Sequence, residues 1–322
     1  MTGSGRAAPN TSVMDNAPPT TETGPDLLRV DPLWARVSHV VFWAIHVACL
    51  AALFTGVSAR AALLCVALYV VRMFVITGGY HRYFSHRSYK TSRAFQLVLA
   101  VVGTMTVQKG PLWWASTHRK HHRYSDTPLD VHSPKQRGFW YSHVGWITGG
   151  DHVTTDLTWV KDLARYPELR WIGKYHWVAP VVLAAACGLV AGWSGLIVGF
   201  AWSTVIGWHA TFTINSLSHV FGRRRYATTD TSRNNWALAV LTMGEGWHNN
   251  HHHYQSSANQ GFYWWEVDVT YYVLRALAAV GIVWDLRRPP RHVIDLGREA
   301  MRRGVELEGR PAGGDDDVAD VA

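Results

Sequence analysis

The chain has 322 residues, 48% of them apolar and 17 of them tryptophan, which suits one large or two ordinary domains. The formal net charge is +8 with an isoelectric point near 9.5, but Lys and Arg lie beside long apolar runs, which favours anionic lipid headgroups or an anionic substrate over nucleic acid. Cys49, Cys65 and Cys187 all lie inside apolar stretches, so we expect buried thiols and neither a disulfide framework nor a zinc knuckle.

Polar tails are expected at both ends of the chain. Residues 1–30 are rich in Thr, Pro, Gly, Asn and Asp without apolar periodicity, which predicts a disordered tail. The first apolar run begins only near Val37, so we expect no signal peptide. Residues 291–322 are expected to form a C-terminal tail that is acidic at its end. One domain, residues 31–290, lies between the tails.

Four apolar segments in this domain have about the length that crosses ~30 Å of hydrocarbon. They are paired into two hairpins: residues 38–57 with 61–78, and 177–192 with 196–214. Arg72 lies in the second span and is expected to snorkel or to face inward. An apolar helix at 94–107 is too short to cross comfortably, so we expect it to be interfacial or half-buried.

Three histidine clusters lie in the polar parts of the chain. In two of them the spacing is i, i+3 and i+4, which on a helix places the side chains within one narrow arc. The first cluster has the spacing i, i+5, which on an α-helix would separate the rings by roughly 140° and suit ligands on different sides of a site. The clusters are His81 and His86; His118, His121 and His122; and His248, His251 and His252.

The distribution of charge predicts the side of the membrane on which these clusters lie. The two hairpin turns contain only Arg60, whereas the segment between the hairpins holds 14 Lys and Arg residues. By the positive-inside rule both turns face outward and all three clusters face the cytoplasm. Asn215 and His219 are four residues apart where the fourth span leaves the membrane, so they share a helix face and can join the clusters there.

Eight clustered histidines exceed the roughly four to six ligands of one ion and suit two ions. A tract that binds metal adventitiously, or three unrelated surface clusters, are the plainer alternatives, but three such clusters in one chain disfavour both. Glu245 and Asp126 are the only close carboxylates, too few for a soluble di-iron bundle, and catalytic zinc needs only three protein ligands. Two redox metals that use dioxygen to oxidise an unactivated C–H bond fit best, and a long acyl chain is the natural substrate at a membrane.

With Asn215 and His219, the three clusters resemble those of the membrane fatty acid desaturases of the stearoyl-CoA Δ9 type. The similarity covers roughly residues 33–286 and extends to the segments 83–89, 138–146 and 244–247. It implies an all-α integral membrane protein with four transmembrane helices in two hairpins and a cytoplasmic helical cap that holds a histidine-rich di-metal site. Residues 31–290 would then be the desaturase domain.

The resemblance also implies the roles of individual residues. Two iron ions would be bound by nine histidines, and Asn215 would act on one ion through water. Gln108, Trp114 and Thr211 stand where the family lines the bend of its acyl tunnel, which presents one carbon–carbon bond to the metals and fixes a cis product. The nine implied ligands are His81, His86, His118, His121, His122, His219, His248, His251 and His252.

Two departures from the family concern its partners. The family's Arg-Asp pair before the second cluster is Ser116-Thr117 here, and an Asn is Lys109, so acyl-CoA, acyl carrier protein and an intact acyl-lipid all remain possible carriers. We expect no appended cytochrome domain, and therefore expect electrons to come from a separate reductase, ferredoxin or cytochrome b5-like protein. Either that partner or lipid headgroups would contact the basic residues Arg82, Arg87, Lys90, Arg119, Lys120 and Arg123.

The remaining histidines are expected to be structural. His46, His143, His176 and His209 lie in or beside apolar sequence, where a hydrogen-bonded histidine is the common case. His253 points about 100° away from His252 on a helix, so it is left out of the site. Asp130 or His132 is expected to orient a ligating imidazole.

We therefore expect an oxygen-dependent desaturase that introduces a cis double bond, at Δ9, into a saturated long-chain acyl group. Its expected place is the bacterial cytoplasmic membrane, with both termini and the active site on the cytoplasmic side. A hydroxylase with a similar histidine site is the first alternative, because the two reactions differ only in fine substrate placement. A non-catalytic membrane metal-binding protein or transporter is the second, but it predicts ionisable residues along a path through the spans.

Overall fold

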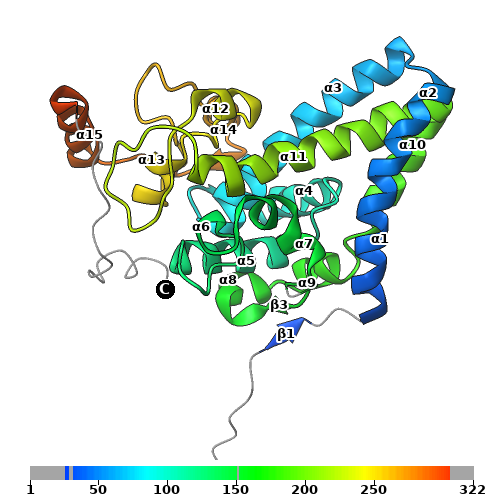
Figure 1. Cartoon of the computed structure of the whole chain (residues 1–322), viewed down its shortest axis with the longest axis horizontal. Coiled ribbons are helices and arrows are strands. Elements are labelled where there is room, and N and C mark those ends of the chain that lie inside the picture. The colour runs from blue at the N-terminus through cyan, green and yellow to red at the C-terminus, as the bar shows by residue number, and fades with distance from the viewer. Residues whose placement is uncertain (1–25, 29–31, 151, 305–322) are drawn as a thin grey trace, which may run out of the picture.

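The structure, a computed structural model, describes residues 26–28, 32–150 and 152–304, and most of these are helical (Figure 1). Two short antiparallel pairs, β1 (Leu27–Leu28) with β3 (Thr155–Asp156) and β2 (Lys90–Thr91) with β4 (Val283–Trp284), join distant segments. The helical elements are α1 (Pro32–Ala48), η1 (Cys49–Ala51), α2 (Ala52–Thr55), α3 (Ala59–Phe74), η2 (Val75–Ser85), α4 (Arg93–Thr104), α5 (Pro111–Tyr124), α6 (Pro134–Arg137), η3 (Tyr141–Gly145), α7 (Trp146–Thr148), η4 (Leu157–Val160), α8 (Lys161–Ala164), α9 (Pro167–Lys174), α10 (Val178–Ser194), η5 (Gly195–Trp202), α11 (Ser203–Ser216), η6 (Leu217–His219), α12 (Trp236–Leu241), α13 (His248–His253), α14 (Val269–Ala279) and α15 (Arg291–Arg303).

Three helical segments of the described chain are long and apolar enough to cross a membrane: Arg36–Thr55, Ala59–Ser85 and Val178–His219. The third has 42 residues, which as one straight helix would be about 63 Å long, twice the thickness of the hydrocarbon core. It is interrupted at Ala191 and Gly192, whose backbone angles are not helical. Figure 1 accordingly shows α10 and α11 as separate arms. Four membrane crossings remain a prediction.

The turns of the two helical hairpins lie together. The backbone N–H of Ser58 donates to Oγ of Ser194 over 3.1 Å, and that hydroxyl donates to the carbonyl oxygen of Gly56 over 3.0 Å. Gly195 permits the close return of the second hairpin, because a Cβ there would lie 2.0 Å from the carbonyl oxygen of Cys187. Both turns are therefore at the same end of the apolar arms.

The second apolar helix is longer than expected and changes its winding. It was expected to end near residue 78, but α3 continues as the π-helix η2 to Ser85. The backbone N–H of His86 donates to the carbonyl oxygen of His81 over 3.2 Å. Residues five apart are one turn apart in a π-helix, so the expected separation of roughly 140°, which assumed an α-helix, is wrong. Both rings lie on one side, with centroids 4.8 Å apart.

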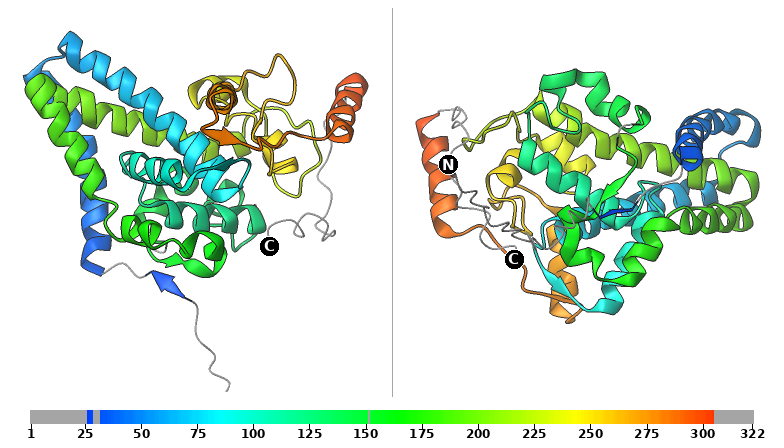
Figure 2. Two further views of the ribbon diagram at one scale, coloured as in Figure 1. Left: turned by 180° about the vertical axis from the view of Figure 1, so that it is seen from behind. Right: turned by 90° about the horizontal axis from the view of Figure 1, so that it is seen from below.

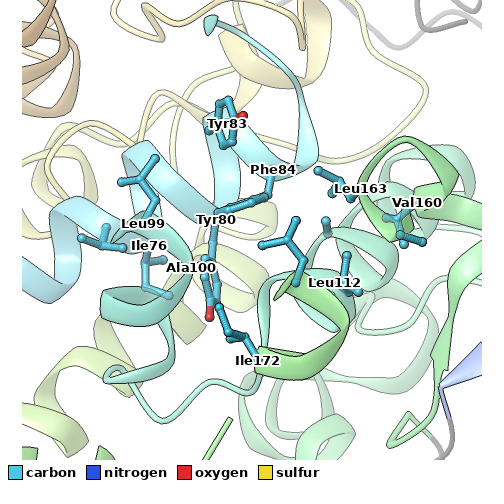
Figure 3. Close-up of a cluster of buried hydrophobic side chains, with 14 of the residues drawn as sticks. Ile76, Tyr80, Tyr83, Phe84, Leu99, Ala100, Leu112, Val160, Leu163 and Ile172 are labelled. Atoms are coloured by element: carbon cyan, nitrogen blue, oxygen red, sulfur yellow. The ribbon is translucent and has the colours of Figure 1, made fainter. Parts of the chain in front are cut away.

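A compact cap of short helices packs against η2. Figure 3 shows Tyr80 and Phe84 of η2 among Leu99 of α4, Leu112 of α5 and Leu163 of α8. All five side chains are essentially inaccessible to solvent. This core fixes η2 and α5, the two elements that carry the first two histidine clusters.

Each of the two expected tails includes a short element among the described residues. Residues 26–28 include strand β1, and most of the N-terminal segment predicted to be disordered lies outside the described residues. At the other end, the expected C-terminal tail contains the helix α15, whose Val293 packs with Tyr226 and Tyr263. Figure 2 shows α15 at the opposite edge of the molecule from the apolar arms in both views. The domain boundaries themselves stay predictions.

Candidate metal centre

Nine histidines gather into two adjacent groups in which the ligand atoms of each group all lie within 4.8 Å of one another. They come from η2, α5, η6 and α13 and from the residue that follows η2. The first group is His81, His86, His118, His122 and His251, and the second group is His121, His219, His248 and His252. These are the nine histidines named from the sequence.

Two helices contribute to both groups. On α5, His121 faces the second group while His122, the next residue, faces the first. On α13, His251 and His252 divide in the same way. Adjacent residues on an α-helix point about 100° apart, so a helix that lies between the groups supplies each of them. The expected helical spacing of both clusters is confirmed.

The imidazoles of the first group point their Nε2 atoms toward a common centre. Nε2 of His251 lies 3.0 Å from Nε2 of His81 and 3.0 Å from Nε2 of His122. Nε2 of His118 lies 2.8 Å from Nε2 of His86 and 3.0 Å from that of His122. In the second group, Nε2 of His219 and Nε2 of His248 are 3.1 Å apart.

Carboxylates orient several of these rings from behind. Nδ1 of His121 donates to Asp130 over 2.9 Å, and Nδ1 of His252 donates to Asp230 over 2.6 Å. Nδ1 of His81 is paired with Glu245. A proton fixed on Nδ1 leaves only a lone pair on Nε2, which is the arrangement that orients a metal ligand.

This donor set fits metal cations. Lone pairs that face each other over about 3 Å repel unless a proton or a cation lies between them. In the second group, the buried Nε2 of His252 has no hydrogen-bond partner among the described residues. Such orphaned buried groups are costly, and nitrogen donors of this kind suit iron, zinc, copper or nickel.

Burial favours the neutral, ligating form of most of these rings. Burial, reinforced by neighbouring imidazoles, holds the pKa of His86, His118, His122, His248 and His251 well below its usual range. Burial alone would lower the pKa of His121 too, but the charge of Asp130 outweighs it and raises that pKa. Burial would raise the pKa of Asp130, yet the His121 imidazole holds it well below its usual range. The carboxylate therefore stays ionised behind its ring.

The orienting carboxylates were only partly foreseen. Asp130 was named from the sequence as an orienting residue, and its hydrogen bond to His121 confirms that prediction, while the ring of His132 lies 4.2 Å from that of His121. Asp230 was missed because it lies 22 residues before its partner His252, in a polar loop with no ligand spacing. Only the fold brings the two together.

Arg82 is not part of the surface that was expected to contact a partner or lipid. Its side chain is fully buried, with Nη1 2.9 Å from Asp268 and Nη2 3.0 Å from Glu245. Burial removes it from any contact with a partner or with lipid. Of the other five basic residues, Arg87 and Arg119 pair with Asp162, Lys120 pairs with Asp156, Lys90 pairs with Asp285, and Arg123 is exposed.

Histidines outside the two groups have other contacts. The ring of His253 stacks on Tyr226 with centroids 4.3 Å apart, in agreement with its exclusion from the site. Nε2 of His46 lies 3.1 Å from Nε2 of His209, whose Nδ1 lies 3.0 Å from Nε2 of His143. These three rings connect α1, α11 and η3, which is a structural role.

An apolar cavity of about 750 Å³ reaches both histidine groups, with His118 and His248 in its wall. Gln108, Trp114 and Thr211 also line it, and Nε2 of Gln108 donates to Oγ1 of Thr211 over 3.2 Å. The indole of Trp114 stacks on the ring of His118, with centroids 4.9 Å apart. Asn215 is a further lining residue.

The family model and three curated proteins that match this chain are all described as desaturases. The family described as "Fatty acid desaturase" matches residues 58–284. An acyl-CoA 5-desaturase of Anemone leveillei is 38% identical over 267 residues, 80% of this chain and 83% of that protein. An sn-1 stearoyl-lipid 9-desaturase of Anabaena variabilis is 37% identical, covering 66% of this chain and 78% of that protein. A Delta-9 acyl-lipid desaturase of Arabidopsis thaliana is 37% identical, covering 80% and 85%.

Proposed function

The chain belongs to the fatty acid desaturase family, and we propose that it introduces a cis double bond, at Δ9, into a saturated long-chain acyl group with dioxygen as co-substrate. The observation that carries this proposal is the apolar cavity that leads to both histidine groups. Such a cavity admits a hydrocarbon chain and excludes water. The resemblance and the Δ9 relatives support the position of the bond.

Two iron ions would be held by the two histidine groups, five imidazoles around one ion and four around the other. Asn215, which lines the cavity, would act on one ion through water. When bound, the ions supply the reduction of dioxygen and the oxidation of an unactivated C–H bond, chemistry that side chains cannot perform. Asp130, Asp230 and Glu245 would keep the rings in the ligating tautomer.

The residues of the cavity would position the substrate. The Gln108–Thr211 hydrogen bond lies in the cavity wall, and the indole of Trp114 stacks on His118 of the first histidine group. Together they would hold one carbon–carbon bond of the acyl chain near the ions and set its geometry. Placement of this kind separates desaturation from hydroxylation, because both begin with the removal of one hydrogen.

The substrate would be carried as acyl-CoA or acyl-lipid, and electrons would come from a separate reductase, ferredoxin or cytochrome b5-like protein. The cavity wall includes Val41 of α1 and Val181 of α10, which are 39% and 58% exposed on apolar helices. An acyl chain can therefore reach the cavity from the lipid phase. The enzyme would lie in the bacterial cytoplasmic membrane, with its histidine groups and both termini on the cytoplasmic side.

The direct test is product analysis in a bacterial host that expresses the chain with a competent electron donor. Fatty acids are separated by gas chromatography and identified by mass spectrometry, with double bonds located chemically. We expect a new monounsaturated acid with wild type, the same acid with His253→Ala, and none with His121→Ala. A hydroxylated acid would identify the alternative oxidation, and no product from folded, membrane-inserted protein would contradict the proposal.

A further inference from the structure

Part of the acyl cavity is bounded by a small polar wall. A second pocket of about 10 Å³, room for about one water molecule, lies directly behind the cavity. The two share four lining residues: Met73, Ile76, Gln108 and Thr211. Behind this partition lie Tyr69, Arg72, Thr106, Ser203, Thr204 and Gly207. An acyl chain that extends past the Gln108–Thr211 pair therefore meets this wall.

Arg72 is the central group of the wall and is only 5% exposed. Its Nη1 donates to Oγ1 of Thr204 over 2.8 Å and to the carbonyl oxygen of Met105 over 3.2 Å. Its Nη2 donates to the hydroxyl of Ser203, and its Nε donates to the carbonyl oxygen of Leu68. The side chain is thus fixed between α3, α11 and the residue that follows α4. Its inward orientation confirms one of the two arrangements expected from the sequence.

An arginine inside an apolar helical span is costly and commonly marks a functional position. No carboxylate of the described residues pairs with Arg72; its partners are hydroxyls and backbone carbonyls. A methyl end that advanced into the small pocket would have to displace this hydrogen-bonded guanidinium. Contact between the methyl end and the guanidinium gains no favourable free energy, and displacing the guanidinium breaks its hydrogen bonds.

We propose that Arg72, anchored by Ser203 and Thr204, closes the distal end of the acyl cavity and sets the greatest chain length that the enzyme accepts. This inference rests on the proposed desaturase function. It adds a specificity-determining residue that does not touch the reacting carbons. The limit would apply to the part of the acyl chain that extends past the Gln108–Thr211 pair.

The wall can be opened without leaving its hydroxyls unpaired. The hydroxyls of Ser203 and Thr204 also donate to the carbonyl oxygen of Phe200, over 3.0 Å and 2.7 Å. They keep these bonds when the guanidinium is removed. Arg72→Met therefore loses the polar wall, retains an unbranched side chain, and leaves two carbonyl oxygens, those of Leu68 and Met105, without the guanidinium donor.

The test compares Arg72→Met with wild type on a series of saturated acyl substrates that differ by two carbons. Arg60→Met is the matched control, because Arg60 lies exposed in the first turn of the same helix. One surplus methylene in an apolar pocket costs about tenfold or more in discrimination. We expect Arg72→Met to raise the ratio of product from the next longer chain to product from the preferred chain by about tenfold, with the double bond at the same position from the carboxyl end.

The possible outcomes separate the inference from the proposed function. Wild type without any unsaturated product would refute the function. Wild type, Arg60→Met and folded Arg72→Met with the same chain-length profile would uphold the function and refute the role of Arg72. If Arg72→Met does not survive size-exclusion chromatography in detergent, Arg72→Lys replaces it, because a shorter cation reaches fewer of the anchors. A folded Arg72→Lys with an unchanged profile would equally overturn the inference, whereas a shift toward longer chains supports it.

Discussion

Each of the nine imidazoles belongs to one of the two histidine groups, although the groups share helices α5 and α13. His86 belongs only to the first group and His248 only to the second. Each group keeps at least three nitrogen donors after one loss, but its geometry is then incomplete. The two groups should therefore respond separately to substitution.

We expect His86→Ala and His248→Ala each to lower the iron bound by the purified protein from about two ions per chain to about one. Iron content is measured by mass spectrometry after reconstitution, so the result does not depend on activity. His253→Ala is the matched control, because its ring stacks on Tyr226 and should leave two ions bound. Full iron content in both ligand variants would contradict the assignment of the nine histidines.

The effect of a single orienting carboxylate on metal retention should also be measurable. Asp230→Asn replaces the acceptor of the His252 Nδ1–H by an amide that can present its NH₂ group instead. Loss of such an orienting partner typically costs about 10–100-fold in metal affinity. We expect weaker retention of one ion against a chelator, with the other unaffected. Asp285→Asn, at an exposed ion pair with Lys90, should match wild type; equal retention in both variants would show that Asp230 has no such role.

Lys109 gives the stability of the protein a pH dependence. Burial lowers the pKa of this lysine, which lies over the ring of Trp113, to about 7. In the unfolded chain its pKa is about 10.4. Between these values the unfolded chain binds a proton that the folded chain does not, so stability rises with pH across that window, and the full penalty applies below pH 7.

Lys109→Met should therefore raise the melting temperature most at pH 7 and below, and the gain should fade toward about pH 10. Thermal unfolding in detergent, followed by tryptophan fluorescence at several pH values, measures it. Lys174→Met is the control, because Lys174 is exposed at the end of α9. This substitution should leave the pH dependence of the melting temperature unchanged. If Lys109→Met raised the melting temperature equally at every pH, the titration of Lys109 would be contradicted. The change in side-chain packing would then explain the increase.

At the scale of elements, packing between α4 and η2 determines where the first histidine cluster lies. Gly103 of α4 faces Tyr80 so closely that a Cβ there would lie 2.0 Å from the phenol ring. Tyr80 is fully buried and adjoins His81. This contact therefore links α4, which carries none of the nine histidines, to the position of η2, which carries His81.

Gly103→Ala should destabilise the protein by about 1–3 kcal/mol, as overpacked cores do, and should disturb the first iron ion more than the second. Gly188→Ala is the matched control on α10: nothing lies within 4 Å of a Cβ there, so the better helix propensity of alanine should leave stability unchanged or slightly raised. Melting temperature and iron content are read together. Equal effects at both glycines would argue against the close fit at Tyr80.

The sequence predicted those elements whose spacing is local. The i, i+3 and i+4 histidines required an α-helix to converge, and α5 and α13 provide it. The winding of η2 could not be predicted in this way, because a π-helix arises from i→i+5 hydrogen bonds that tertiary packing selects. Asp230 behind His252 and the burial of Arg82 depend on contacts between segments 22 and more than 160 residues apart. No local pattern carries such pairs.

At the scale of the whole molecule, the contact between the two hairpin turns limits the number of possible orientations in a membrane. Ser194 bonds to both Ser58 and Gly56, so the two turns must lie on the same side of a membrane. The histidine groups are at the other end of the apolar arms, near Ser85 and His219, where the long apolar segments end. Only two orientations are then possible, and the charge distribution favours the one with the turns outside.

Thiol labelling in bacterial spheroplasts distinguishes these orientations. Val57 and Trp193 are 56% and 73% exposed at the turns, and Leu129 is 67% exposed on the cap. Cysteine placed at Val57 or Trp193 should react with a membrane-impermeant maleimide in intact spheroplasts, whereas cysteine at Leu129 should react only after permeabilisation. Cys65 and Cys187 are buried as expected, whereas Cys49 is only half-buried and is replaced by alanine to keep the background of the labelling low. The reverse pattern would place the metal groups outside the cytoplasm, and a cytoplasmic electron donor could then no longer reach them.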